Sequence, residues 1–131
     1  GVEIIHEGGV RFTALCRNHR ITIDQPVEAG GTDAGPTPPE LLAASMGSCV
    51  GYYVARFLEQ AGLADRNIAI ECDWTVSKDT PKRIDCIRLQ LKIPGLPENR
   101  LAAVQRVAGH CLIHQTLKQE PEVSLQVDTV I

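Results

Sequence analysis

The spacing of apolar and polar residues changes several times along this chain of 131 residues. Apolar and polar residues alternate over roughly 9–16 and 20–25, and this alternation predicts the two strands of a hairpin. The same alternation recurs over about 67–77 and 83–93, on either side of the polar turn KDTPK, and again over 123–130. We therefore predict two hairpins and a final strand that closes a sheet.

The longest apolar stretch has a different character. Between Glu40 and Arg56 the chain runs for fifteen residues without a charged side chain, and its Leu, Ala, Ser and Met content favours a helix. Thr37 is the expected N-cap and Gly62 lies just past the expected end, so we predict a helix over 38–60. The uncharged stretch is shorter than the ~20 apolar residues of a membrane span, which indicates a core helix and no membrane partner.

A second, amphipathic helix is predicted from Pro97 to near Gly109. The order of strands, buried helix, strands, helix and strand is typical of an α+β fold, and the length fits a single domain over 1–131. A helix that is apolar on nearly all faces needs cover all round, which one chain of this size hardly supplies. We therefore expect a homodimer in which two such helices are packed between antiparallel sheets.

Charge and composition narrow the classes of partner. The net charge is -3 and no run of Lys or Arg is present, which argues against nucleic acid and anionic lipid as partners. The charge and composition agree better with a small neutral or apolar ligand than with a polyanionic partner. The first residues, GVEIIHEGGVRF, have neither a basic flank nor an apolar core of a signal peptide, so a cytoplasmic location is expected.

Five cysteines are an odd number, they are widely spaced, and none forms a C-x-x-C pair, which argues against a disulfide framework and a zinc ribbon. Cys16 and Cys72 fall in apolar rows of predicted strands and are expected to be core residues. Cys86 lies on the more polar side of its strand, and no role is assigned to it.

The two remaining cysteines both point inward from predicted helices. Cys49 lies in the middle of the apolar helix, where a free thiol is either inert packing or a reactive group. Cys111 lies just past the end of the second helix and continues its apolar stripe of Leu101, Val104 and Ala108. Two thiols that meet in a core can react with a peroxide, the first forming a sulfenic acid and the second condensing with it to a disulfide.

Two segments resemble the OsmC/Ohr family of thiol-dependent peroxidases: EAGGTDAGPTPPELLAASMGSCVGYYV around Cys49 and GHCLIHQTLKQ around Cys111. The resemblance covers nearly the whole chain. It implies an OsmC-like fold in which antiparallel sheets pack around a long central helix in an intertwined homodimer. It also implies reduction of organic hydroperoxides without a cofactor, with Cys49 as the peroxidatic cysteine, Cys111 as the resolving cysteine and a dithiol as the reductant.

The family also uses a glutamate and an arginine. The glutamate lies ten residues before the reactive cysteine, where this chain has Pro39, so Glu40 is the nearest candidate. Glu40 can equally serve the helix N-terminus through the macrodipole. For the arginine, which lies in the N-terminal hairpin, Arg17 is the first candidate and Arg20 the second. A guanidinium close to a thiolate would lower the thiol pKa.

The second-cysteine segment departs from the usual Cys-Pro of the family, because Leu112 follows Cys111 and His114 stands where a serine is common. With His110, these residues form an H-C-x-x-H pattern that could ligate zinc, with Cys49 as a fourth ligand. No other part of the chain has metal-ligand spacing, so we expect no metal, and surface histidines are the simpler interpretation.

Residues close to Cys49 along the helix are candidates for a substrate pocket. Tyr52 and Tyr53 follow it at i+3 and i+4 and could wall such a pocket, although core packing is the simpler role. Gly47 and Gly51 could leave room for substrate or, as we prefer, allow close approach of a partner helix. The leading hypothesis is a peroxidase for organic hydroperoxides. The alternative is a non-catalytic protein of the same fold that binds a small apolar or thiol-reactive ligand in this pocket.

Overall fold

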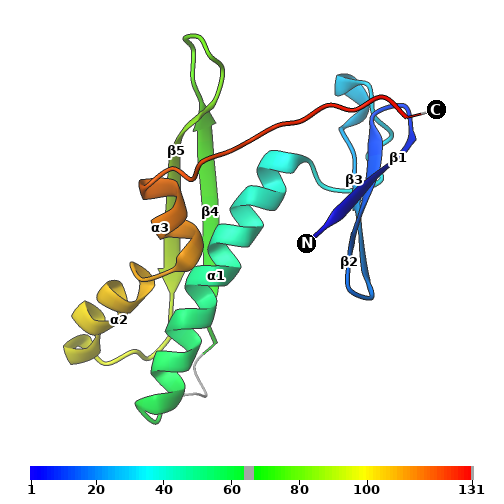
Figure 1. Cartoon of the computed structure of the whole chain (residues 1–131). Coiled ribbons are helices and arrows are strands. Elements are labelled where there is room, and N and C mark those ends of the chain that lie inside the picture. Colours follow the sequence, from blue (N-terminus) through cyan, green and yellow to red (C-terminus); the bar gives the residue numbers. More distant parts are fainter. Residues whose placement is uncertain (64–66, 131) are drawn as a thin grey trace. The chain divides into compact units, whose positions relative to one another are not determined.

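The structure is a computed structural model that describes residues 1–63 and 67–130. The chain begins with three strands, continues through the long helix α1 and two further strands, and then forms short helices (Figure 1). The elements are β1 (Glu3–Gly8), β2 (Arg11–Cys16), β3 (His19–Ile23), the 3-10 helix η1 (Val27–Ala29), α1 (Pro38–Gln60), β4 (Ala69–Val76), β5 (Ile84–Lys92), the 3-10 helix η2 (Glu98–Arg100), α2 (Leu101–Ala108) and α3 (Leu112–Lys118). The predicted α+β class is confirmed.

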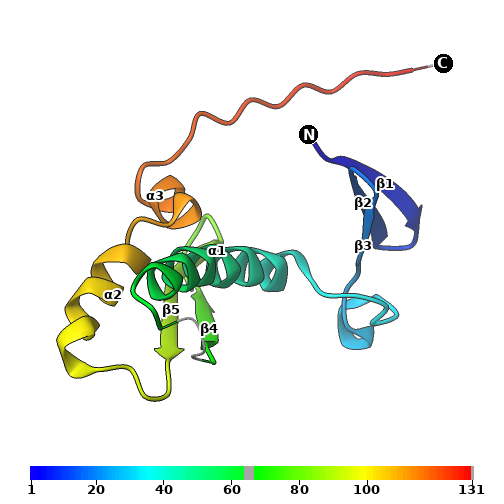
Figure 2. The same ribbon diagram turned by 90° about the horizontal axis from the view of Figure 1, so that it is seen from below.

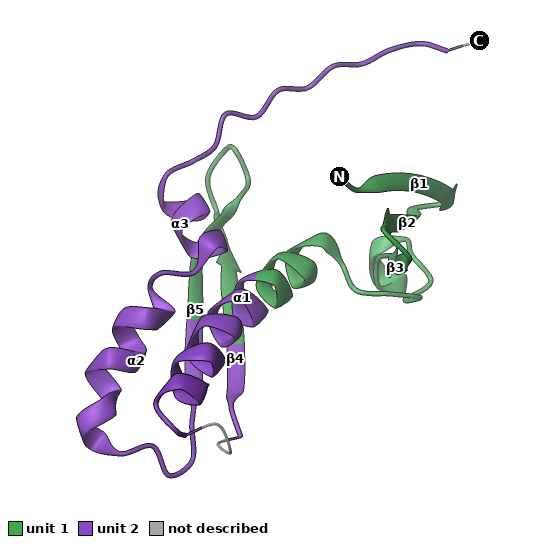
Figure 3. Ribbon diagram, turned by 60° about the horizontal axis from the view of Figure 1, so that its bottom comes forward, with its two compact units in different colours: residues 1–45, 72–88 green, residues 46–71, 89–131 purple. Residues whose placement is uncertain are grey.

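The described chain divides into two compact units, coloured separately in Figure 3. The first comprises residues 1–45 and 72–88, and the second comprises 46–71 and 89–131. The N-terminal strands belong to the first unit, whereas α2, α3 and the greater part of α1 belong to the second. Both units interleave in sequence, and the single domain over 1–131 stays a prediction.

The N-terminal sheet has the antiparallel order β1-β2-β3. The predicted hairpin corresponds to β2 and β3, and the sequence pattern did not indicate β1. The cause lies in the two adjacent apolar residues Ile4 and Ile5, which interrupt the alternation that marks a half-buried strand. One face of the sheet is apolar and remains exposed in the single chain, since Ile4, Phe12 and Ile21 all keep more than a third of their surface accessible.

Thr37 caps the start of α1, as the sequence predicted, and forms a capping box with Glu40 that was not predicted. The backbone N–H of Glu40 donates to Thr37 Oγ1 at 3.4 Å, and the Thr37 N–H donates back to Glu40 Oε1 at 2.9 Å. The buried residues recur every three or four positions and define one inward face. They are Ala43, Met46, Val50, Val54 and Leu58.

By length and composition alone, α1 could cross a membrane, because its most apolar window reaches a mean hydropathy of 1.3. Only 28% of that window is buried in the single chain, so the helix is less enclosed than the sequence pattern predicted. A core helix of a water-soluble protein passes the same test. The inward face described above and the packing of Val54 and Leu58 at 0% and 1% exposure support the core role for α1.

The second unit holds the main hydrophobic core, in which α1, α2 and the start of α3 meet. The β4–β5 hairpin and α2 confirm the predicted strands and helix, and α3 was not predicted. The strand predicted over 123–130 is wrong for the described chain, where 119–130 forms neither helix nor strand and runs out as an extended segment (Figure 2). A strand requires a hydrogen-bonded neighbour, and Val123 and Leu125 instead stay more than four-fifths exposed.

A buried carboxylate organises the glycine-rich loop before α1. Asp24 is 1% exposed and accepts hydrogen bonds from the N–H groups of Gln25 (2.8 Å), Thr32 (3.2 Å) and Ala34 (3.0 Å), and from Thr32 Oγ1 (2.7 Å). The hydroxyl of Thr32, followed by the N–H groups of Ala34 and Gln25, lowers the pKa of Asp24 from 3.8 to about 2. The ionised form of Asp24 therefore holds the loop in place.

This pKa predicts how folding stability depends on acid. Because the pKa of Asp24 is lower in the folded chain, its contribution is present above pH 3.8 and is lost as the pH falls towards 2. In Asp24→Asn we expect a lower urea midpoint at pH 7 and a flatter decline between pH 4 and pH 2 than in wild type. Urea unfolding at several pH values measures both, and parallel pH curves for the two proteins would contradict the assignment.

Candidate functional site

Cys49 and Cys111 are brought together in the second unit. Cys49 lies half-buried on α1, next to the buried Val50, and packs against the core cluster that contains Cys111. Cys111 is 0% exposed and is the N-cap residue of α3, with its backbone at φ −54° and ψ 131°. The two thiols, widely separated in sequence, therefore share one site, as their inward orientation predicted.

Within the described residues, the hydrogen bonds that lower the pKa of the Cys49 thiol come from the start of α3. Burial raises the pKa of Cys49, but hydrogen bonds from the Cys111 thiol and from the N–H groups of Ile113 and Leu112 outweigh burial and lower the pKa below the ordinary value. Each of these donors favours the thiolate, because the negative sulfur is the better acceptor. The arrangement therefore favours the thiolate form of Cys49, and a catalytic role for this thiol stays a prediction.

Cys111 has the opposite tendency. Burial, followed by its hydrogen bond to Cys49 and the nearby charge of that thiolate, raises the pKa of Cys111 and outweighs the N–H groups of His114 and Ile113. The His114 N–H lies 3.4 Å from Cys111 Sγ, the geometry of a weak N-cap. The surroundings thus shift the pKa values of the two thiols in opposite directions, down for Cys49 and up for Cys111.

The local sequence explains why the chain turns at this point. Gly109 follows α2, and its carbonyl accepts a 2.7 Å hydrogen bond from Gln115 Nε2 on α3. This bond ties the two short helices across Cys111. The N–H donors of Leu112 and Ile113 were not predicted from the sequence. The available signal was the Cys111 N-cap followed by a new helical segment.

Leu112 offers a direct test of these donors. A proline at this first position of α3 suits helix geometry, and the extended backbone of Cys111 tolerates a following proline. Leu112→Pro removes one N–H donor, so we expect Cys49 to titrate at higher pH and to be alkylated roughly three- to tenfold more slowly at pH 7. Leu112→Ala keeps the N–H and is the matched control. Indistinguishable pH profiles of Cys49 alkylation in the two variants would refute the role of this donor.

The predicted pocket residues follow Cys49 along α1. Tyr53 is half-buried and packs on the core cluster, whereas Tyr52 is 59% exposed and meets Tyr53 edge to face, with ring centroids 5.4 Å apart. A Cβ at Gly47 would meet only Ile70 Cγ2 at 3.8 Å, and one at Gly51 would meet Ile70 Cδ1 at 3.1 Å. Packing within the chain therefore leaves room for alanine at Gly47.

The predicted carboxylate and arginines belong to the first unit. Both hydrogen bonds from Thr37, through its N–H and its hydroxyl, end on Glu40 Oε1 and lower the pKa of Glu40. This engagement supports the helix-capping role of Glu40. Arg17 is exposed in the β2–β3 turn with φ 53°, and Arg20 is exposed on β3. A catalytic role for any of the three stays a prediction.

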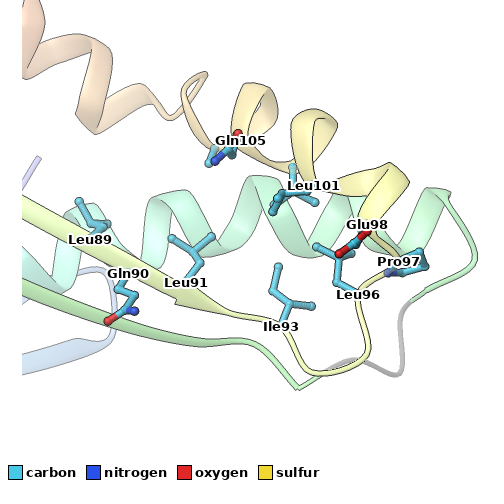
Figure 4. Close-up of a pocket in the computed structure, with 11 residues that line it drawn as sticks. Leu89, Gln90, Leu91, Ile93, Leu96, Pro97, Glu98, Leu101 and Gln105 are labelled. Carbon is cyan, nitrogen blue, oxygen red and sulfur yellow. The ribbon is translucent and has the colours of Figure 1, made fainter.

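An apolar cavity of about 510 Å³ lies between β5, η2 and α2 (Figure 4). Apolar residues, mostly leucines, form the greater part of its wall, and Gln90, Glu98 and Gln105 supply its polar groups. Neither cysteine lines it, but Val104 and Ala108 belong both to its wall and to the cluster that contains Cys111. The cavity was not predicted, although its two walls correspond to the predicted apolar rows of the strand and helix.

The described residues contain no group of three His, Cys, Asp or Glu side chains that could hold a metal ion. The H-C-x-x-H pattern of His110, Cys111 and His114 therefore finds no support as a zinc site in residues 1–63 and 67–130. Cys86 is exposed, as its position on the polar side of the strand predicted, and its sulfur accepts a 3.3 Å hydrogen bond from Arg88.

Solved structures show which class of fold this is. The chain is similar to a Psychrobacter arcticus protein named as a candidate osmotic stress induced and detoxification response protein, at TM-score 0.80 and 19% identity over 88% of this chain and 85% of that one. It is also similar to the organic hydroperoxide resistance protein OsmC of Legionella pneumophila, at TM-score 0.70 and 14% identity over 91% of this chain and 88% of that one. For the organic hydroperoxide resistance protein OhrB of Bacillus subtilis, the TM-score is 0.68 and the identity 18%, over 92% of each chain. The chain thus has the OsmC/Ohr fold.

The family itself is shown by sequence. The model of the family described as OsmC-like protein matches residues 31–126, which include both Cys49 and Cys111. The chain belongs to the OsmC-like family. A comparison with curated protein sequences finds no match.

Proposed function

We propose that this protein is a thiol-dependent peroxidase that reduces organic hydroperoxides. The observation that carries the proposal is the contact between Cys49 and Cys111, in which hydrogen bonds lower the pKa of the first thiol and burial raises that of the second. Family membership and neighbours named organic hydroperoxide resistance proteins support the same activity.

In the first step, the Cys49 thiolate attacks one oxygen of the hydroperoxide. An S–O bond forms, the O–O bond breaks, and the leaving alkoxide takes a proton from solvent to become an alcohol. Cys49 is oxidised to a sulfenic acid and the hydroperoxide is reduced. The N–H groups of Leu112 and Ile113 stabilise the thiolate before the attack.

In the second step, Cys111 loses its proton and attacks the sulfenic sulfur of Cys49. An S–S bond forms, the S–O bond breaks, and the hydroxyl leaves with that proton as water. The buried contact between the two sulfurs favours this condensation over further oxidation of Cys49. An external dithiol then reduces the disulfide by thiol–disulfide exchange and is itself oxidised to a disulfide.

Apolar surroundings favour organic over hydrogen peroxide. Tyr53, Phe57 and Ile113 pack with Cys49 against the same core cluster, so an alkyl group attached to the peroxide would contact apolar carbon close to the sulfur. Hydrogen peroxide gains nothing from such a contact.

The proposal is tested by adding one equivalent of cumene hydroperoxide to the reduced protein and counting free thiols by mass spectrometry. We expect rapid loss of two thiols in wild type and in the control Cys86→Ser, whose exposed thiol lies outside the pair. Cys49→Ser is expected to lose none, and Cys111→Ser to accumulate sulfenic or overoxidised Cys49. An unchanged thiol count in wild type after minutes would overturn the peroxidase proposal.

We also propose that the chain works as an intertwined homodimer. In the single chain the exposed face of α1 carries Tyr52, and apolar residues of β1–β3 and of 119–130 also remain exposed. A partner helix close to Gly47 would explain a glycine where the chain itself has room for alanine. Analytical ultracentrifugation should show a dimer at micromolar concentration, weakened in Gly47→Ala. A stable wild-type monomer would refute this.

The cavity favours one alternative function, in which the protein holds a small apolar ligand without catalysis. Its volume of about 510 Å³ and its leucine-rich walls suit a ligand of drug-like size. A charged residue on the wall would oppose such binding, and Leu101 can accept the change because it is 51% exposed.

Titration with a fluorescent apolar probe tests this alternative. We expect saturable binding that Leu101→Glu weakens at least about tenfold, since a carboxylate must then be desolvated. Ala102→Glu places the same charge on α2 outside the cavity and should leave binding unchanged. Equal binding by the two variants would place the probe elsewhere and reject the cavity as its site.

A further inference from the structure

A second hollow lies on the N-terminal sheet, in the first unit, whereas Cys49 and Cys111 belong to the second. It encloses about 300 Å³ and is lined by Glu7, Arg11, Thr13, Arg20, Thr22 and Ala34, all of which belong to the first unit. We propose that this hollow binds a small organic molecule through its carboxylate or phosphate group.

Strand register places the two arginines around one spot. Thr13 on β2 pairs with Thr22 on β3, and the strands are antiparallel. Arg11 precedes Thr13 by two residues and Arg20 precedes Thr22 by two, so all four side chains share one face of the sheet. Because the strands run in opposite directions, the arginines flank the threonine pair from its two sides.

Neither guanidinium has a partner in the part of the chain that the structure describes. Arg11 and Arg20 form no hydrogen bond or ion pair with any residue of 1–63 or 67–130, although Glu7 lines the same hollow. A guanidinium presents a planar fork of N–H donors that matches a carboxylate or phosphate. Two arginines and one glutamate leave the hollow with a net charge of +1, which favours an anionic ligand.

The floor of the hollow supplies an independent observation. Thr13 is a polar residue with only 6% exposure, and its hydroxyl forms no hydrogen bond to another described residue. Buried hydroxyls nearly always form a hydrogen bond. The Thr13 hydroxyl lines a hollow between two unpaired arginines, so a ligand bound in the hollow would supply its hydrogen-bond partner. An oxyanion can accept from this hydroxyl and from both guanidinium groups.

The loop before α1 forms one wall of the hollow, and contacts within the chain hold this loop in place without a ligand. Ala34 lines the hollow, and its N–H donates to the buried Asp24 carboxylate. The adjacent Gly35 runs so close to β3 that a Cβ there would overlap the Thr22 carbonyl. The site is therefore built from a sheet and a tied loop, which limits the ordering required on binding. Since a volume of 300 Å³ exceeds what one inorganic ion fills, we assign an organic anion.

The test is a titration of the purified protein, followed by amide NMR shifts, with succinate, glycerol 3-phosphate and inorganic phosphate at constant ionic strength. We expect saturable shifts at Thr13 and Thr22 with succinate or glycerol 3-phosphate, and the better probe identifies the preferred acidic group. Arg11→Gln and Arg20→Gln should each weaken the apparent affinity tenfold or more. Arg100→Gln, an equal change of charge in the second unit, should not.

Three outcomes would overturn the proposal: no saturable shift with either organic probe, saturation by inorganic phosphate alone, or equal weakening in Arg100→Gln. The amide spectra of the variants report their folding in the same experiment. The cysteine chemistry does not enter this measurement, so its result is independent of the peroxidase proposal.

Discussion

In Cys111→Ala, Cys49 should titrate at higher pH than in wild type and should be alkylated about tenfold or more slowly at neutral pH. The reason is the hydrogen bond from the Cys111 thiol, the strongest of the effects that lower the pKa of Cys49. A hydrogen bond to a charged group contributes about 1.5–3 kcal/mol, and its loss leaves burial, which raises the pKa, less opposed. The measurement is the rate of iodoacetamide modification of Cys49 against pH, followed by mass spectrometry.

Cys86→Ala is the control for this experiment, because it removes an exposed thiol on β5 that has no part in the pair. Its Cys49 profile should match wild type. If Cys111→Ala also matched wild type, the thiol contact would not activate Cys49, and the N–H groups of Leu112 and Ile113 would remain as the source of activation. The variant thus separates two causes of a low thiol pKa that act on the same sulfur.

Gly35→Ala should destabilise the protein by about 1–3 kcal/mol, the usual range for a side chain forced into occupied space. An added Cβ would overlap the backbone carbonyl of Thr22, and neither backbone can move without disturbing β3 or the loop held by Asp24. Urea unfolding followed by circular dichroism measures the loss.

Gly9→Ala provides the comparison for Gly35→Ala. Gly9 has φ 56° and open space around its Cβ position, so the substitution meets only backbone strain, of roughly 1 kcal/mol. We expect Gly35→Ala to lower the free energy of unfolding more than Gly9→Ala does. The reverse order would mean that the loop before α1 moves easily away from β3.

Elements with strong local signals were predictable from the sequence. Thr37 and Glu40 form the capping box that starts α1, and the period-two rows predicted β4 and β5. The inward orientation of Cys111 followed from helical spacing, and that of Cys49 from the uncharged apolar stretch around it. In each case the residues that determine the local structure lie within one short segment of the sequence.

Features that depend on contacts between distant segments could not be predicted in the same way. The strand expected over 123–130 has the alternation of a strand but no neighbour in the described chain. The Asp24 carboxylate accepts hydrogen bonds from residues up to ten positions away, and no local sequence pattern predicts which residues donate them. The N–H groups that face Cys49 carry no side-chain signature, because any residue except proline at Leu112 would supply the same donor.

The complete burial of Cys111 determines how the oxidised site would be reopened. A reductant from solvent cannot reach the Cys111 sulfur, which has 0% exposure, but it can approach the half-buried Cys49. The entering thiolate would therefore form its mixed disulfide with Cys49, and Cys111 would be the leaving thiol. Selectivity for the electron donor would therefore be set by the surroundings of Cys49, where Tyr53 and Phe57 also pack on the core cluster.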